Sequence, residues 1–330
     1  MNARAGSSGI REPAAAALRP SRQINIVLRK ADSAADAAQG LADSAAAASG
    51  VKAMPQTGPW SDWHKELDKM VGLENVKDLV YEIYALLQIS QFRSEAGLHA
   101  HAHVYHMIFK GNPGTGKTTV ARLLAKLFQN MGLLTKGHLV EVERADLVGE
   151  YIGHTAQKTR ELVKKALGGV LFVDEAYSLA RGGEKDFGKE AIDTLVKAME
   201  DYKNQFVLIL AGYTMEIDAF LLTNPGLPSR FPIAMEFPDY TADQLIQIAE
   251  GMAKDRDYSL LPQSLFKLRD LILQEKTESI YPFSNARYVR NVIERAIRNQ
   301  AVRLLAVYPT GASPGRQELM ALRAEDIKSI

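Results

Sequence analysis

Residues 111–118 read Gly-Asn-Pro-Gly-Thr-Gly-Lys-Thr and match the G-x-x-x-x-G-K-[ST] pattern of a phosphate-binding loop in full. An apolar run at 104–109 precedes the loop, and apolar residues recur at helical spacing after it, from Val120 to Met131. A loop that joins a strand to a helix presents backbone amides at a helix N-terminus, where they can bind a polyphosphate. The stretch therefore predicts a nucleoside triphosphate site in an α/β domain.

Each side chain of the loop has an expected task. Lys117 is expected to contact the β- and γ-phosphates, the Thr118 hydroxyl to bind Mg²⁺, and Thr119 to contact the α-phosphate. The glycines allow backbone conformations that a side chain would forbid. The candidate nucleotide-binding residues of this segment are Gly111, Asn112, Pro113, Gly114, Thr115, Gly116, Lys117, Thr118 and Thr119.

A second motif places two carboxylates after an apolar run. Val170-Leu171-Phe172-Val173 has the character of a buried strand, and Asp174 and Glu175 follow it directly. Asp174 is expected to hold Mg²⁺, and Glu175 is expected to polarise the water that attacks the γ-phosphate. The pair predicts that the bound nucleotide is hydrolysed, with Lys117, Asp174 and Glu175 as catalytic residues.

Apolar patterns that alternate between strand and helix follow the loop. Strands are expected at 139–142, 170–173, 206–211 and 233–237, with helices between them. Such alternation predicts a parallel sheet covered by helices on both faces, with ligands at the carboxyl ends of the strands. After residue 238 the pattern is helical, and Thr241 with Gln244 forms a capping box.

Composition limits the classes of function. The chain of 330 residues has 40 Lys and Arg against 39 Asp and Glu, so no basic field favours a nucleic-acid partner. It has no cysteine, which fits a reducing cytoplasm, and no apolar stretch long enough to span a membrane. The alternating histidines His99, His101 and His103 have no carboxylate or thiol among them, so a linker is a better interpretation than a metal site.

The expected domains follow from these patterns. Residues 1–59 form an alanine-rich, largely disordered tail with one short strand at 23–28. Residues 60–238 form the nucleotide-binding α/β domain, residues 239–308 a small helical lid domain, and residues 309–330 a C-terminal extension.

The motifs and their order resemble the AAA+ ATPases, and further residues are named from that resemblance. Tyr151-Ile152-Gly153 is similar to the loop with which the family grips a polypeptide in the pore of a ring. Arg230 stands where the family has an arginine finger that reaches the neighbouring subunit's nucleotide, although Pro228 occupies the place of a second arginine. The resemblance implies ATP and Mg²⁺ as ligands and a homo-oligomer, a hexameric ring.

Three more assignments come from the same resemblance. Val71 and Gly72 are similar to the segment beside the adenine. Arg287, in Asn285-Ala286-Arg287-Tyr288-Val289-Arg290-Asn291, is the expected lid contact to the phosphates, with Arg290 as its support. Either Tyr213 or Thr214 is expected to orient the attacking water as the first sensor.

Within the AAA+ ATPases three stretches, Gly149 to Thr155, Asp174 to Leu179 and the motif that begins at Asn285, resemble the branch that holds red-type Rubisco activases and a bacterial sporulation protein. The resemblance implies a cytoplasmic ring that remodels a protein client, of unknown identity, in endospore maturation. Three alternatives stay open: a Rubisco-activase-like remodeller, a nucleic-acid motor, and a slow ATP-gated scaffold. Arg181 to Gly188, a charged loop flanked by glycines, is either a second pore loop or a surface loop.

Overall fold

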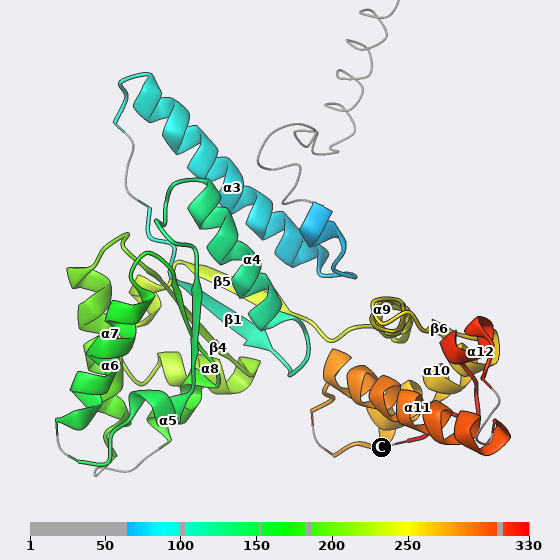
Figure 1. Cartoon of the computed structure of the whole chain (residues 1–330). Coiled ribbons are helices and arrows are strands. Elements are labelled where there is room, and N and C mark those ends of the chain that lie inside the picture. The colour runs from blue at the N-terminus through cyan, green and yellow to red at the C-terminus, as the bar shows by residue number, and fades with distance from the viewer. Residues whose placement is uncertain are drawn as a thin grey trace, which may run out of the picture. The chain divides into compact units, whose positions relative to one another are not determined.

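The computed structural model of the chain describes residues 65–99, 103–151, 153–181, 186–280, 282–308 and 313–329 (Figure 1). These residues belong to one structural unit, Gln56–Ile330. The alanine-rich tail and the short strand expected at 23–28 lie outside the described residues, as do Ile152 and residues 182–185 of the loop from Arg181 to Gly188.

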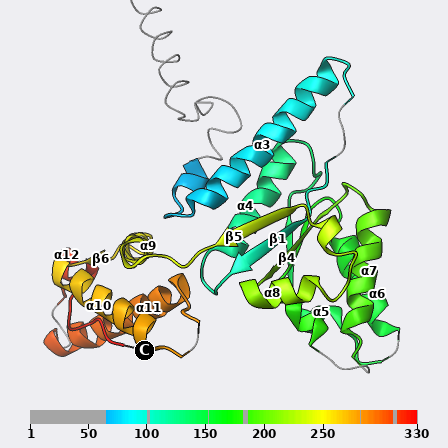
Figure 2. The same cartoon turned by 180° about the vertical axis from the view of Figure 1, so that it is seen from behind.

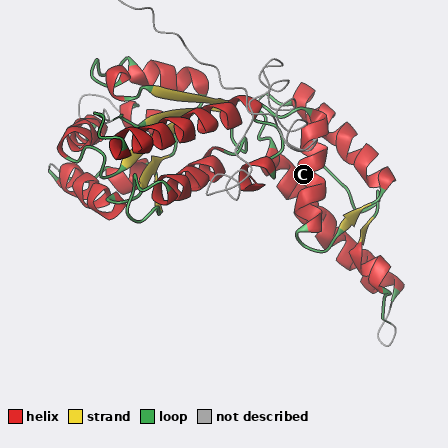
Figure 3. Ribbon diagram, turned by 90° about the horizontal axis from the view of Figure 1, so that it is seen from above, coloured by secondary structure: helices red, strands yellow, loops and turns green. Residues whose placement is uncertain are grey.

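A five-stranded parallel sheet forms the centre of the larger domain, in the order β2-β3-β4-β1-β5. Its strands are β1 (Met107–Gly111), β2 (Leu139–Val142), β3 (Val170–Val173), β4 (Val207–Gly212) and β5 (Ile233–Phe237). Every residue of β3 and β4 is buried, because helices lie on both sides of the strands (Figure 3). The expected fold class is confirmed. The first strand begins at Met107 and not at Val104, whose side chain is exposed.

Besides a helical turn at 65–68, this domain has six α-helices whose bounds both lie in the described part of the chain. They are α3 (Glu74–Glu95), α4 (Lys117–Asn130), α5 (Arg144–Leu147), α6 (His154–Ala166), α7 (Gly188–Asp201) and α8 (Thr214–Leu221). Short 3-10 turns follow β3, at Ala176–Ala180, and precede β5, at Pro228–Arg230. Helix α4 packs on β2 and β3, and α8 packs on β1 and β4. Figure 2 shows β5, β1 and β4 side by side from behind.

Aromatic side chains hold the middle of the sheet together. The ring of Phe109 in β1 lies 5.0 Å from that of Phe237 in β5 and 6.3 Å from that of Phe172 in β3, centroid to centroid. All three are almost completely buried, and each such side chain stabilises the fold by roughly 1.5–3 kcal/mol. This packing fixes β1, and with it the loop that follows at Gly111.

The smaller domain is helical. It contains α9 (Ala242–Lys254), α10 (Pro262–Glu278), α11 (Ala286–Val307) and α12 (Arg316–Met320). The capping box expected at the start of α9 is present, since Gln244 N–H donates to Thr241 Oγ1 at 3.2 Å and Thr241 N–H donates to Gln244 Oε1 at 2.9 Å. No helix in the described part of the chain is long and apolar enough to cross a membrane.

The last described segment, 313–329, packs on this helical domain. Strand β7 (Ala321–Leu322) pairs in parallel with β6 (Ser259–Leu260), which follows α9. The buried carboxylate of Asp326 accepts two hydrogen bonds from the Arg303 guanidinium, at 2.8 and 2.9 Å. The C-terminal extension expected at 309–330 therefore contributes a strand and an ion pair to the helical domain.

His106, the residue directly before β1, has a buried neutral side chain. Its Nδ1 accepts a hydrogen bond from the Leu208 amide at 3.0 Å, and its ring lies between those of Phe206 and Phe231. Burial lowers the pKa of His106 to about 4. The histidine-rich segment before β1 thus ends in a core residue, and the described residues hold no group of three His, Cys, Asp or Glu side chains that could bind a metal.

The burial of His106 predicts an acid-dependent loss of stability. Between pH 6.5 and about 4 the unfolded chain binds a proton at His106 that the folded chain does not, so the free energy of unfolding falls as the pH is lowered. Over the whole window this amounts to about 3 kcal/mol. Asn at this position keeps an acceptor for Leu208 and does not titrate. Urea denaturation at several pH values should show a shallower pH dependence for His106→Asn, and an equal slope in both proteins would contradict the assignment.

Candidate nucleotide-binding site

The loop from Gly111 to Gly116 connects β1 to α4, as Figure 1 shows, and α4 begins at Lys117. Gly114 and Gly116 have φ values of +72° and +98°, in the left-handed region that favours glycine. A Cβ atom on Gly114 would lie 2.2 Å from the Ser284 carbonyl oxygen, so there is no room for a side chain. The loop therefore has the conformation that lets backbone amides surround an anion at the start of a helix.

Lys117 lies across the loop. Its Nζ donates to the carbonyl oxygens of Gly111 and Asn112, at 2.7 and 2.8 Å. Burial lowers the pKa of Lys117, and the Arg287 guanidinium lowers it further, while the Asp174 carboxylate opposes both effects. The ammonium group is thus held against the loop backbone, close to the Asp174 carboxylate, which follows β3, and to the Arg287 guanidinium of the lid.

The acidic pair follows β3 in a strained turn. Asp174 accepts a hydrogen bond from the Glu175 amide at 3.0 Å, and Glu175 has a φ of +47°. A left-handed conformation at a residue other than glycine costs about 1–3 kcal/mol and persists only where the surroundings enforce it. Such strain is often found at functional sites, and here it turns the Glu175 side chain out to an exposed position in the cavity described next.

A cavity of about 360 Å³ brings the two motifs and the lid together. Four cationic side chains, Lys117, Arg122, Arg287 and Arg290, face two carboxylates, Asp174 and Glu175, so the lining carries a net positive charge. This balance suits a polyanion. The lining residues are Gly111, Pro113, Gly114, Gly116, Lys117, Thr118, Thr119, Arg122, Asp174, Glu175, Gly212, Tyr213, Ala286, Arg287 and Arg290.

Four of the expected nucleotide-binding residues do not line this cavity. Asn112 turns its amide to Asp239, at 2.9 and 3.0 Å, and Thr115 is buried and donates to the Asn112 carbonyl oxygen at 2.7 Å. Val71 and Gly72 lie to one side, where a Cβ atom on Gly72 would meet the Gln244 side chain at 2.5 Å. They stay near the loop, because their neighbours Met70 and Leu73 both approach Gly116.

The two candidates for the first sensor differ in position. Tyr213 lines the cavity, whereas Thr214 does not line it and begins α8. The Tyr213 ring lies 5.9 Å from that of Tyr177, and burial, followed by the Glu175 charge, raises the pKa of the Tyr213 hydroxyl. Tyr213 is therefore a neutral hydroxyl beside the acidic pair.

Three lining residues were missed from the sequence. Arg122 lies four residues after Thr118 on α4 and forms an ion pair with Glu141 at 2.5 Å. The i, i+4 spacing is a signal that could have placed Arg122 on the same helix face as Thr118. Gly212 and Ala286 line the cavity through their positions beside Tyr213 and Arg287, and no sequence pattern marks them.

Arg230 and Tyr151 lie away from this cavity. The Arg230 guanidinium donates to the Gly226 carbonyl oxygen at 2.8 Å and pairs with Glu200. Tyr151 is 66% exposed, and its ring packs edge-on against His154 at 5.4 Å. Neither side chain therefore reaches the loop of its own chain.

Comparison with known families identifies the class of protein. Residues 107–239 match the "ATPase family associated with various cellular activities (AAA)", and residues 241–330 match the AAA lid domain. The chain belongs to the AAA family, and it is an ATP hydrolase.

Individual relatives narrow the resemblance within the family. Stage V sporulation protein K of Bacillus subtilis (strain 168) is 54% identical over 92% of this chain and 93% of its own length. Protein CbbX of Cereibacter sphaeroides is 45% identical over 80% and 85%, and the chloroplastic ribulose bisphosphate carboxylase/oxygenase activase of Cyanidioschyzon merolae (strain NIES-3377 / 10D) is 43% identical over 79% and 89%. The branch expected from the motifs is confirmed.

Solved structures give the fold. A variant of RuvB from Thermotoga maritima superposes with a TM-score of 0.50 at 20% identity, over 79% of this chain and 68% of that one. At this identity the similarity concerns the fold alone.

We expect Lys117→Ala to remove high-affinity nucleotide binding. Lys117 is the single lysine of the loop, and its ammonium group is one of the cations that line the cavity. Loss of a charged hydrogen bond to phosphate should weaken ATP binding by roughly 10- to 100-fold in isothermal titration calorimetry. Lys126→Ala is the matched control, since Lys126 lies on the same helix but is exposed and pairs with Glu66. Unchanged affinity in Lys117→Ala would place the nucleotide elsewhere.

Proposed function

We propose that this chain hydrolyses Mg²⁺-ATP in a homo-oligomeric ring, a hexamer, and uses the energy to remodel a protein client in the bacterial cytoplasm during endospore maturation. One observation carries the proposal. The cavity of a single chain holds Lys117, the acidic pair and the lid arginines, whereas Arg230 lies outside it, paired with Glu200. A site with every part except its expected arginine is what a shared site between subunits requires.

The lining residues fit a Mg²⁺ complex of a triphosphate. The Thr118 hydroxyl and the Asp174 carboxylate are hard oxygen ligands, and both lie in the cavity. Mg²⁺ held there would neutralise negative charge on the β- and γ-phosphates. Lys117 and the lid arginines Arg287 and Arg290 would counter part of the negative charge that remains on the nucleotide.

The chain's own residues divide the catalytic work. Glu175 accepts a proton from the attacking water at its carboxylate, and its exposed position leaves it accessible to solvent. Tyr213 lies beside it and orients the water through its hydroxyl. Arg287 contacts the phosphates from the lid, and Arg230 of one subunit stabilises charge at the site of the next.

Mixing two inactive variants tests whether the site is shared. Glu175→Gln and Arg230→Ala should each lower ATPase turnover by roughly 100-fold or more while leaving ATP binding intact. In mixed rings, a site from an Arg230→Ala subunit keeps Glu175 and can receive Arg230 from a Glu175→Gln neighbour. About a quarter of the interfaces of an equimolar ring have this arrangement, so the mixture should regain up to about a quarter of the wild-type rate.

The control for this mixture is each variant mixed with itself at the same total concentration. Activity no greater than the sum of the two separate variants would show that Arg230 does not act across an interface. Analytical ultracentrifugation of the Glu175→Gln protein with ATP measures the ring itself, and a persistent monomer would contradict the hexamer.

The exposed position of Tyr151 supports the proposal that the client is a polypeptide. A tyrosine that is 66% exposed offers a large contact area at low entropic cost and is suited to gripping an extended chain. The Glu175→Gln protein should trap clients in sporulating cells. Adding Tyr151→Ala to the Glu175→Gln protein should lower the amount of captured client about tenfold, whereas adding Tyr151→Phe should leave this amount unchanged. Equal capture by the alanine and phenylalanine variants, quantified by mass spectrometry, would remove Tyr151 from the grip.

A second candidate function is supported by the activase relatives. The chain is 45% identical to CbbX and 43% identical to an enzyme named as a ribulose bisphosphate carboxylase/oxygenase activase. The higher identity to the sporulation protein, over more of both chains, favours the sporulation role. Reactivation of an inhibited red-type carboxylase by this chain and ATP would favour the activase function instead.

A further inference from the structure

Asn285 is a buried polar residue at the junction of loop and lid. Its side chain is completely buried, and its backbone has φ +48° and ψ −125°, a strained conformation for a residue other than glycine. It occupies the N-cap position of α11, where asparagine usually accepts a hydrogen bond from the first turn of the helix. Here the side chain makes no such bond, so it is used for something other than capping.

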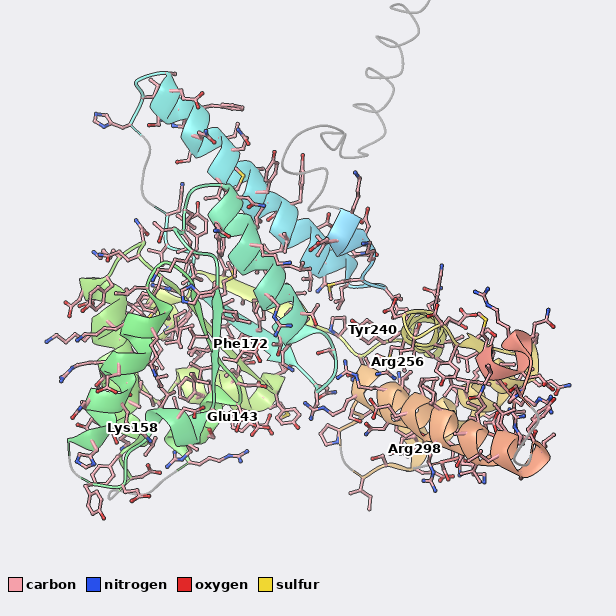
Figure 4. The ribbon with its side chains drawn as sticks, viewed as in Figure 1. Glu143, Lys158, Phe172, Tyr240, Arg256 and Arg298 are labelled. Atoms are coloured by element: carbon pink, nitrogen blue, oxygen red, sulfur yellow. The ribbon has the colours of Figure 1, made fainter. Side chains whose placement is uncertain are left out.

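The Asn285 amide instead joins the segment between β5 and α9 to the phosphate-binding loop. Its Oδ1 accepts from the Tyr240 amide at 3.0 Å, and its Nδ2 donates to Asp239 Oδ1 at 2.7 Å. The carbonyl oxygen of Phe283 lies 3.0 Å from Nδ2, and that of Pro113 lies 3.4 Å from it. Figure 4 labels Tyr240 in this connecting segment.

The Asp239 carboxylate is the centre of the connection. It accepts from Asn285 Nδ2 on the lid side and from Asn112 Nδ2 on the loop side, the latter at 2.9 and 3.0 Å. Two further hydrogen bonds reach the loop: the Ala286 backbone amide donates to the Gly114 carbonyl oxygen at 3.2 Å, and the Tyr240 side-chain hydroxyl donates to the Thr115 carbonyl oxygen at 3.0 Å. The loop and the first turn of α11 are therefore tied by side chains and by backbone.

We propose that Asn112, Asp239 and Asn285 form a positioning cluster that sets Arg287 over the phosphate-binding loop. Arg287 lies two residues after Asn285 and lines the cavity, whereas none of the three cluster residues does. The cluster acts on ATP hydrolysis through Arg287, and the proposal rests on the phosphate contact proposed for that arginine. It also makes Asp239, two residues after the end of β5, the residue that connects the phosphate-binding loop to the start of α11.

A carboxylate suits position 239 because Oδ1 accepts from the amides of both Asn285 and Asn112, and Oδ2 also accepts from Asn112, at 3.0 Å. Asparagine has one accepting oxygen and one donating NH₂ group, so Asp239→Asn leaves two donors facing each other at one contact. The substitution keeps the size of the side chain. A lost or mismatched hydrogen bond at this buried junction should change the position of Arg287 and lower ATPase turnover by about tenfold.

A double-mutant cycle with Arg287→Ala tests the proposal. Asp239→Asn should lower kcat about tenfold in the wild-type background and by less than about twofold in the Arg287→Ala background, because the residue through which it acts is absent. Asn112→Ala provides a second cycle with a milder change, expected to cost about threefold alone and nothing further with Arg287→Ala. Hydrogen exchange should also be faster at the Tyr240 and Ala286 amides of Asp239→Asn.

Asp243→Asn is the matched control. It makes the same change of charge four residues further on, at an exposed carboxylate that pairs with Arg269 at 2.6 Å. Its turnover should stay within about twofold of wild type. Thermal melting of all variants separates a loss of folded protein from a loss of turnover.

Two results would overturn the proposal in distinguishable ways. If the losses from Asp239→Asn and Arg287→Ala multiply in the double variant, the cluster does not act through Arg287, although the proposed role of Arg287 stands. If Arg287→Ala alone retains the wild-type rate, the proposed phosphate contact itself is wrong.

Discussion

The close approach of the phosphate-binding loop to its two neighbours is the constraint on which the rest of the site depends. A Cβ atom on Gly111 would lie 2.3 Å from the Phe237 carbonyl oxygen, and one on Gly114 would lie 2.2 Å from that of Ser284. The loop is thus enclosed by the end of β5 on one side and by the lid on the other. Because Phe109 anchors β1 in the core between Phe172 and Phe237, the position of the loop follows from the packing of the sheet.

The electrostatics of the cavity follow from the same arrangement. In a parallel sheet the carboxyl ends of the strands lie at one edge, so the acids after β3 and Tyr213 after β4 meet the loop after β1. The lid adds Arg287 and Arg290 from the first turns of α11. Like charges from separate elements are brought together here, and burial and the Arg287 guanidinium lower the pKa of Lys117. This energetic cost is recovered when a polyanion binds.

Local patterns predicted the loop, the acidic pair and the order of strands and helices, because each is carried by a few adjacent residues. The sequence could not predict the links made by Asp239, which join residues 46 and 127 positions away along the chain. The sequence pointed to Asn285 only as part of the motif that contains Arg287. A sequence does not show whether the side chain of an N-cap residue caps its helix or binds elsewhere. The pairing of β6 with β7 was also missed, because two-residue strands are too short to show alternation.

The ion pair between Arg230 and Glu200 has a thermodynamic consequence for assembly. Both side chains are partly exposed, at 28% and 56%, and ion pairs of this kind contribute about 1 kcal/mol or less. The pair therefore holds the guanidinium in one orientation at little gain in stability. If Arg230 reaches a neighbouring subunit, as proposed, leaving Glu200 costs about 1 kcal/mol or less, so this ion pair hardly opposes association.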